Sequence, residues 1–274
     1  MRSDVAAMRL LQPRTVDEAV LLLRDNPGTA PLAGGTDLYV ALNLGTLSGT
    51  SFLDLWALDE LRQIRDTDGM LSIGALASYS EIIRSRAVRA RVPMLVAAAR
   101  EIGGVQIQNR GTLGGNIANG SPAGDSLPVL LAADAVVVLR STAGERRVPL
   151  VDFYTGYRQS VIRSDEIITA VEVPRAEGAQ WFRKVGTRAA QAVSKVVMAG
   201  IRGDRVRLAI GSVAPVPLRL RRTEESLSNG ADMVQARTEL EAEIAPLDDL
   251  RSTERYRRRV AGNLLERFWR ETAG

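Results

Sequence analysis

The feature that most constrains the fold of this chain is a glycine-rich segment near its middle, TLGGNIANGSPAGD, which runs from Thr112 to Asp125. The segment has two adjacent glycines and almost no large side chain, so it buries little apolar surface and loses much backbone entropy on folding. Either a set of tight turns or a ligand held against the backbone has to compensate for ordering it. We expect a loop here, followed by a helix over residues 126–133.

A second segment, Ala33-Gly-Gly-Thr-Asp37, follows the same plan as Thr112-Leu-Gly-Gly-Asn116: two glycines precede a small polar residue where a strand or loop enters a helix. Glycine at such a junction leaves main-chain N–H groups open to an anion. Neither segment fits the spacing G-x-G-x-x-G, and the chain has no G-x-x-x-x-G-K-[ST], so a standard Rossmann or P-loop site is not supported.

Two interpretations of the glycine pairs remain open from the residues alone. Each pair can be a tight turn or a helix cap. Alternatively, two such loops from two domains hold the diphosphate of a dinucleotide between their N–H groups, where side chains would block its approach. The amides and the carboxylate over residues 116–125 would suit the sugar and base of that nucleotide.

Two absences in the composition exclude several kinds of site. The 274 residues include no cysteine and no histidine, which excludes disulfides, thiolate-bound iron–sulfur clusters, zinc sites built on those residues and triads with an imidazole base. The usual side chains for covalent flavin attachment are missing as well. Any redox chemistry therefore requires a cofactor that is bound non-covalently.

Charge and hydropathy limit the partners. Lys and Arg number 36 against 32 acidic residues, with arginine clusters at 219–222 and 255–259. A nucleic-acid surface is one interpretation, but the low aromatic content of 4% and the lack of a recognition motif favour a solvated face or a protein-binding surface. The longest apolar run, 127–139, is interrupted by Asp134 and is too short to span a membrane. The first four residues do not begin an apolar leader, which predicts a cytoplasmic location.

The order of the elements predicts an α+β fold with mixed sheets, because hairpins precede helices in place of a regular βαβ alternation. We expect three units: a small α/β unit over 1–51, a mixed sheet with helices over 52–174, and a small antiparallel sheet with helices over 179–274. Capping boxes at 15–18 and 78–81 start two helices. Turns at 68–69 and 143–144 close two hairpins, and 252–271 forms an amphipathic terminal helix.

The segments PLAGGTDL and TLGGNIANGSPAGDSLPVLLA closely resemble the two flavin-binding motifs of the FAD-binding medium subunit of molybdenum hydroxylases, the family of xanthine dehydrogenase and carbon monoxide dehydrogenase. The resemblance continues through LQPRTVDEAVLLL, LSIGALASYSEI, DEIITAVEVP, KVGTRAAQAVSKVVMA and RYRRRVAGNLLERF. It implies a two-part FAD-binding domain of the vanillyl-alcohol-oxidase (PCMH) type, followed by a smaller C-terminal domain. It also implies non-covalent FAD in this chain, with molybdopterin on a large partner subunit and [2Fe–2S] clusters on a small one. Electrons would then leave through FAD to an external acceptor, which is NAD, oxygen or a quinone.

Position by position, the resemblance assigns cofactor binding to Pro31, Leu32, Ala33, Gly34, Gly35, Thr36, Asp37 and Leu38 in the first motif, to Thr112, Leu113, Gly114, Gly115 and Asn116 in the second, and to Ile102, Asn119, Asp125, Ile168 and Lys184 elsewhere. Asn119 and Asp125 would bind the ribityl or adenosine end, and Ile102 would pack near the nucleotide. Lys184 is the cation expected beside the N1–C2=O edge of the flavin, where it would stabilise the reduced ring; otherwise it is a surface lysine. Lys195 is the second choice for this role. No catalytic or metal-binding residue is predicted.

Two departures from the family pattern matter. The first motif reads Gly-Gly-Thr-Asp where carbon monoxide dehydrogenases usually have Gly-Gly-His-Ser, which disfavours that branch. Residues 186–195 contain no aromatic side chain to cover the flavin, as a tyrosine does in some relatives. The alternatives are a stand-alone flavin oxidase or reductase with the same fold and, in another class, a basic scaffold or nucleic-acid-binding protein.

Overall fold

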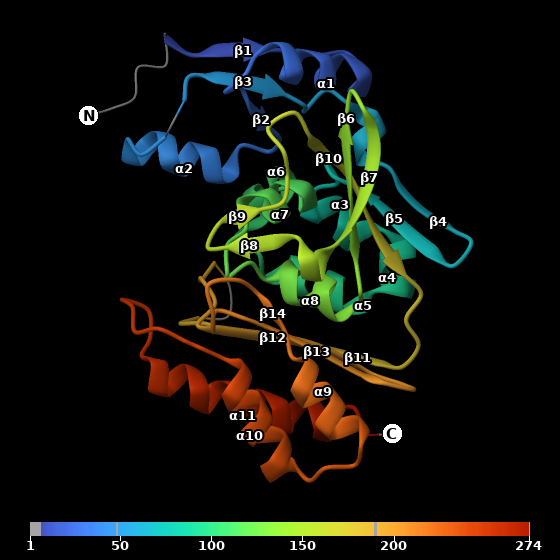
Figure 1. The fold of residues 1–274 in the computed structure, drawn as a ribbon, viewed down its shortest axis with the longest axis vertical. Helices are drawn as coiled ribbons and strands as arrows, with labels where there is room; N and C mark the ends of the chain where they lie inside the picture. The colour runs from blue at the N-terminus through green and yellow to red at the C-terminus, as the bar shows by residue number, and fades with distance from the viewer. Residues whose placement is uncertain (1–6, 48, 189–190, 274) are drawn as a thin grey trace.

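The computed structural model describes residues 7–47, 49–188 and 191–273. Three units, each with its own sheet, follow one another along the long axis of the molecule (Figure 1). The predicted α+β fold is confirmed. The expectation of mixed sheets is wrong for the three units: the first sheet is parallel, and the second and third are antiparallel. The first four residues, on which the leader prediction depends, lie outside the described residues. No helix in the described ranges is both long and apolar enough to cross a membrane.

The first unit is a three-stranded parallel sheet in the order β1 (Arg9–Leu11), β3 (Ser51–Asp54), β2 (Ala30–Leu32). Its middle strand is β3, so the expected boundary after residue 51 falls inside a strand of this unit and is wrong by a few residues. Helix α1 (Val16–Asp25) packs on the sheet. Its N-cap residue is Thr15, whose hydroxyl accepts the N–H of Glu18 as predicted.

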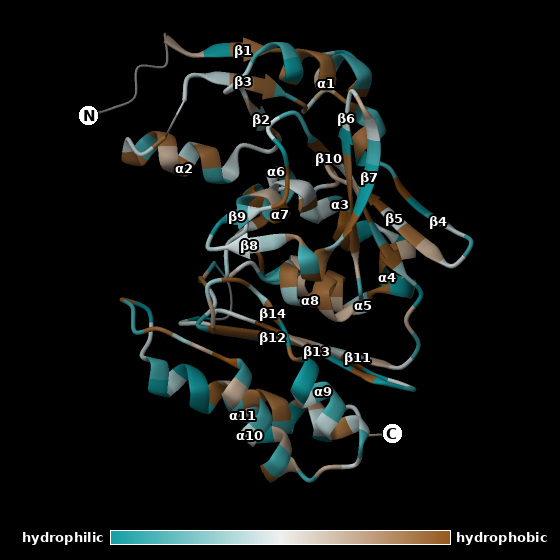
Figure 2. Ribbon diagram, in the orientation of Figure 1, coloured by the Kyte–Doolittle hydropathy of each residue, from teal (hydrophilic) through white to brown (hydrophobic). Residues whose placement is uncertain are grey.

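Helix α2 (Thr36–Leu44) of the same unit stands apart from the sheet (Figure 1). It is one of the most apolar helices of the chain (Figure 2), yet none of its residues is buried, and Tyr39, Val40 and Leu44 are exposed. Glycines in the left-handed conformation flank the helix at both ends, Gly35 and Gly45. No side chain of the helix belongs to one of the buried core clusters.

The second unit is a five-stranded antiparallel sheet in the order β4 (Ile64–Thr67), β5 (Met70–Gly74), β10 (Ile167–Pro174), β6 (Val136–Ser141), β7 (Gly144–Pro149). Both predicted hairpins are confirmed. Asp68 and Gly69 have φ values of 49° and 82°, the positive values that a two-residue hairpin turn requires.

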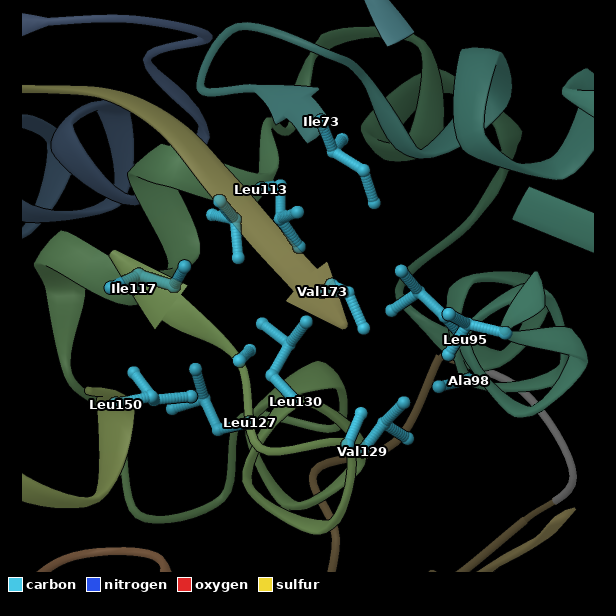
Figure 3. Close-up of a cluster of buried hydrophobic side chains, with 14 of the residues drawn as sticks. Ile73, Leu95, Ala98, Leu113, Ile117, Leu127, Val129, Leu130, Leu150 and Val173 are labelled. Atoms are coloured by element: carbon cyan, nitrogen blue, oxygen red, sulfur yellow. The ribbon is translucent and has the colours of Figure 1, made fainter. Parts of the chain in front are cut away.

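Short elements complete the second unit: η2 (Asp59–Arg62), α3 (Tyr79–Arg84), α4 (Arg86–Arg91), α5 (Pro93–Glu101), α6 (Val105–Arg110), α7 (Leu113–Asn119), α8 (Ser126–Ala132), η3 (Leu150–Asp152), β8 (Tyr154–Gly156) and β9 (Gln159–Ser160). Apolar side chains from α5, α7 and α8 pack against Ile73 and Val173 of the sheet (Figure 3).

The expectation of a loop over 112–125 is wrong for its first half, because 113–119 forms α7. Thr112 caps the helix by accepting the N–H of Gly115, while Leu113 and Ile117 are buried one turn apart. The tertiary contacts of these two side chains outweigh the poor helix propensity of the glycines.

The third unit is a four-stranded antiparallel sheet, β11 (Ala179–Val185), β12 (Val196–Arg202), β13 (Val206–Gly211) and β14 (Leu218–Arg219), followed by α9 (Arg221–Ser228), α10 (Met233–Glu243) and α11 (Glu254–Glu271). Side chains alternate between its two faces. Phe182 and Val197 join the core of α5 and α8, whereas Trp181 and Met198 pack against Phe268 on the side of the C-terminal helices. The second and third units therefore share one continuous hydrophobic core.

Candidate functional site

The first glycine motif lies directly against residues 110–111, which precede the second motif, although the two motifs are far apart in the sequence. A Cβ atom built on Gly34 would lie 1.8 Å from the main-chain oxygen of Arg110 and 3.2 Å from the nitrogen of Gly111. On the other side, a Cβ on Gly115 would lie 4.0 Å from that of Ala33. The first motif is thus pressed against the chain just before the second, and any side chain at position 34 would separate them.

The first motif leads into the N-terminus of α2. Gly35 is the N-cap residue, has a φ of 75° and provides no side-chain cap. Because the first N–H groups of a helix have no intrahelical acceptor, those of Thr36, Asp37 and Leu38 are open to an anion, which the helix dipole also favours. This supports the expected anion site at the first motif.

The second motif is different, and the expectation of bare N–H groups there is wrong. The N–H of Leu113 donates to the carbonyl of Ala77 at 3.1 Å, that of Gly114 to Ala75 at 2.8 Å, and that of Gly115 to the hydroxyl of Thr112 at 3.1 Å. Gly114 is needed for close packing, since its Cβ would lie 2.7 Å from that of Ala75. The glycines of the second motif therefore allow close packing, and the N–H groups that are open to a ligand belong to the first motif.

The two asparagines of the second motif already use their side-chain oxygens. The oxygen of Asn116 accepts a hydrogen bond from the hydroxyl of Ser126 at 2.7 Å, and that of Asn119 accepts one from Arg158 at 3.0 Å. Each side chain therefore keeps only part of its capacity for a ligand: the second lone pair of the oxygen and the amide N–H groups.

Asp125 and Lys184 bind each other. The ammonium group of Lys184 lies 2.6 Å from Oδ2 of Asp125 and 3.2 Å from the carbonyl oxygen of Glu101, and the lysine side chain is only 3% exposed. The hydroxyl of Ser194 donates to the other oxygen of Asp125. Burial raises the pKa of Asp125, although Lys184 and Ser194 act in the opposite direction. Lys184 is therefore neither a surface lysine nor an isolated cation, but one half of a buried ion pair.

The remaining predicted residues are less distinctive. Ile102 is partly buried against the main core, and Ile168 is buried within it. Lys195, the second choice, lies with its ammonium nitrogen 5.1 Å from the ring centre of Tyr256. Residues 186–195 contain no aromatic side chain of their own, and the ring near Lys195 comes from Tyr256 of α11 through folding.

Sequence reasoning missed the residues that hold Arg110 in place. The guanidinium groups of Arg110 and Arg62 lie 3.6 Å and 4.0 Å from the ring centre of Trp56. Arg62 also donates to the carbonyl oxygens of Trp56 and Leu76. An open groove of about 650 Å³ lies against this stack. No local pattern links residues 56, 62 and 110, so the stack could not be predicted from the sequence.

Two further observations bear on the kind of site. Within the described ranges, no group of three or more acidic, histidine or cysteine side chains could hold a metal ion. Arg219 of the first arginine cluster is buried in ion pairs with Asp134 and Glu224. Arg257 of the second cluster binds the carbonyl of Ser212 and the carboxylate of Asp249. These two arginines support the fold and are not part of a basic surface.

Comparison with known proteins identifies the family. The family model for the FAD binding domain in molybdopterin dehydrogenase matches residues 6–176, and that for the CO dehydrogenase flavoprotein C-terminal domain matches residues 180–272. The chain is 33% identical to the glyceraldehyde dehydrogenase medium chain of Sulfolobus acidocaldarius, over 96% of this chain and 97% of that one. It is 34% identical to the xanthine dehydrogenase FAD-binding subunit of Escherichia coli O157:H7, over 89% and 88% of the two chains. The fold matches a chain in the structure of carbon monoxide dehydrogenase from Hydrogenophaga pseudoflava with a TM-score of 0.89 and 30% identity, covering 95% of each chain. The chain therefore belongs to the family of FAD-binding medium subunits of molybdenum hydroxylases.

Proposed function

We propose that this chain is the FAD-binding electron-transfer subunit of a multi-subunit molybdenum-dependent hydroxylase or dehydrogenase. It receives electrons from iron–sulfur clusters on a partner subunit and passes them through FAD to an external acceptor. The observation that carries the proposal is the contact of Gly34 with Arg110, which joins the two glycine motifs beside the open N–H groups of α2.

The residues present fit a bound FAD. The N–H groups of Thr36, Asp37 and Leu38 would hold its diphosphate, because a helix N-terminus with a glycine cap favours a close anion. Gly115 keeps the space toward Ala33 clear. When bound, FAD supplies the ring system that accepts and releases electrons. With no cysteine or histidine in the chain, the cofactor would be held by these non-covalent contacts.

The partners follow from the relatives, whose names describe them as a medium chain and an FAD-binding subunit. We infer a small iron–sulfur subunit and a large molybdopterin subunit as the partners of this chain. Its own residues could not ligate such clusters through thiolates, because it contains no cysteine. The cytoplasmic location stays a prediction from the sequence, and cell fractionation would test it.

Absorbance spectroscopy of the purified chain, before and after incubation with FAD, tests the function. We expect a flavin spectrum whose intensity saturates at one FAD per chain and whose long-wavelength band bleaches on reduction. A chain that takes up no FAD, alone or together with its partner subunits, would contradict the proposal. Sustained oxidation of NAD(P)H or of an alcohol by the isolated chain would favour a stand-alone oxidase or reductase instead.

A further inference from the structure

The buried ion pair of Asp125 and Lys184 connects three separate parts of the fold. Asp125 precedes α8, Lys184 lies near the end of β11, and the carbonyl of Glu101 that also binds Lys184 ends α5. Ser194, just before β12, adds a fourth contact through its hydrogen bond to Asp125. The C-terminal sheet is thus fastened to the FAD-binding domain at this point.

The pair lies beside the second glycine motif. Ser126, the neighbour of Asp125, donates its hydroxyl hydrogen to Asn116. A Cβ on Gly124 would lie 3.2 Å from the side-chain oxygen of the same asparagine. The charges of Asp125 and Lys184 are therefore close to a part of the chain that the family resemblance assigns to the cofactor.

Ser194 determines how the carboxylate is oriented. Its hydroxyl occupies one oxygen of Asp125, and Lys184 occupies the other at 2.6 Å. Ser194 is 2% exposed, and its own carbonyl accepts a hydrogen bond from the hydroxyl of Ser212 at 3.0 Å. Since Asp125 and Ser194 are both buried, a carboxylate without the serine hydroxyl would lose the hydrogen bond to one oxygen and with it its fixed orientation.

We propose that Ser194 is a positioning residue of the FAD site: it holds one oxygen of Asp125 so that the other meets Lys184, and the resulting pair fixes both the place and the charge that the lysine presents to the cofactor. The proposal rests on the proposed function. In this arrangement Asp125 neutralises Lys184, so the flavin meets an ion pair and not a free cation. Ser194 needs no contact with FAD to influence it.

Four single variants of the full chain test the proposal. Ser194→Ala removes the hydroxyl, Asp125→Asn removes the negative charge, and Lys184→Gln removes the positive charge. Ser164→Ala is the matched control, because Ser164 is exposed. The FAD dissociation constant is measured by fluorescence titration, and the flavin midpoint potential by equilibration with redox dyes.

We expect Ser194→Ala to weaken FAD binding about tenfold, since a buried carboxylate loses a hydrogen bond, and Ser164→Ala to match the wild type. Asp125→Asn should shift the midpoint potential to more positive values and Lys184→Gln to more negative ones. The reason is that a flavin gains negative charge on reduction, and the neighbouring charges change in opposite senses.

Two results would overturn the proposal: wild-type FAD affinity and potential in Ser194→Ala, or shifts of the same sign in Asp125→Asn and Lys184→Gln. If Asp125→Asn does not fold, the Ser194→Ala and Lys184→Gln variants still decide the matter. A wild-type chain that binds no FAD contradicts the proposed function instead. The contact itself is then tested by thermal unfolding of Ser194→Ala, Lys184→Gln and their double variant. Additive effects in that cycle would show that the two residues do not act through a shared carboxylate.

Discussion

Replacing Gly34 with alanine should disrupt FAD binding more than it disrupts folding. The added Cβ would start 1.8 Å from the main-chain oxygen of Arg110, and real Cβ contacts are not found below 3.0 Å. Both neighbouring atoms belong to the backbone, and the guanidinium group of Arg110 is stacked on Trp56. The two motifs can therefore relieve the clash only by moving apart as segments.

The size of the effect follows from this geometry. Overpacking of this kind costs about 1–3 kcal/mol of the free energy of unfolding. Loss of two N–H contacts to the diphosphate, at about 1.5 kcal/mol each, would weaken FAD binding roughly 100-fold. Gly28→Ala is the control, because Gly28 has a φ of 82° but no atom within 4 Å of its Cβ position. It should cost about 1 kcal/mol of stability through backbone strain alone and leave FAD affinity unchanged.

The assay pairs a fluorescence titration with FAD and a thermal unfolding curve for the wild type, Gly34→Ala and Gly28→Ala. Gly34→Ala with wild-type FAD affinity would refute the reasoning, because the close contact of the motifs would then be irrelevant to the cofactor. Equal losses of affinity in both variants would attribute the effect to general destabilisation.

Two further predictions concern stability. Thr112→Val should lower the free energy of unfolding by about 1 kcal/mol and speed hydrogen exchange at the amide of Gly115, because the helix cap is lost. Thr112→Ser keeps the hydroxyl and should change neither quantity. Equal exchange rates at Gly115 in the two variants would show that the hydroxyl does not cap the helix. At Asp134 burial acts to raise the pKa, but the hydrogen bonds and charges of arginines including Arg219 and Arg207 outweigh it and lower the pKa below its usual value. A lowered folded pKa gives stability that is present above the unfolded pKa and is lost as the pH falls through the folded one. Urea unfolding should therefore show Asp134→Asn less stable than the wild type at pH 7, with the difference narrowing below about pH 4; a difference that does not depend on pH would contradict the role of this charge.

The parts of the fold that can be predicted from the sequence are those that depend on residues close together in the chain. At Ser78 both hydrogen bonds of the predicted capping box form with Glu81. At Thr15 only half of the box forms, because the carboxylate of Glu18 binds the N–H of Arg14 in place of that of Thr15. The terminal helix begins at 254, within two residues of the prediction.

The predictions are wrong where the local structure depends on residues that are distant in the sequence. Helices α6 and α7 could not be predicted, since α7 depends on the burial of Leu113 and Ile117 and on acceptors supplied by Ala75 and Ala77. The same is true of the site. The glycine pairs indicated two anion loops, but a sequence does not show that the donors of the second are used internally. Nor does it show that Asp125 has a lysine as its partner.

The hydrophobic core that α8 shares with β12 and β13 limits how the chain can be divided and how its sequence can evolve. Two separate family models meet between residues 176 and 180, which makes that point look like a natural place to cut. A cut there would expose one face of α8 on the N-terminal fragment, and Phe182 and Val197 on the C-terminal fragment would lose the apolar residues that cover them. A chimera with the C-terminal part of a relative therefore also needs the α8 residues that pack against that part. In evolution, substitutions in α8 and in β12 or β13 should have occurred in compensating pairs.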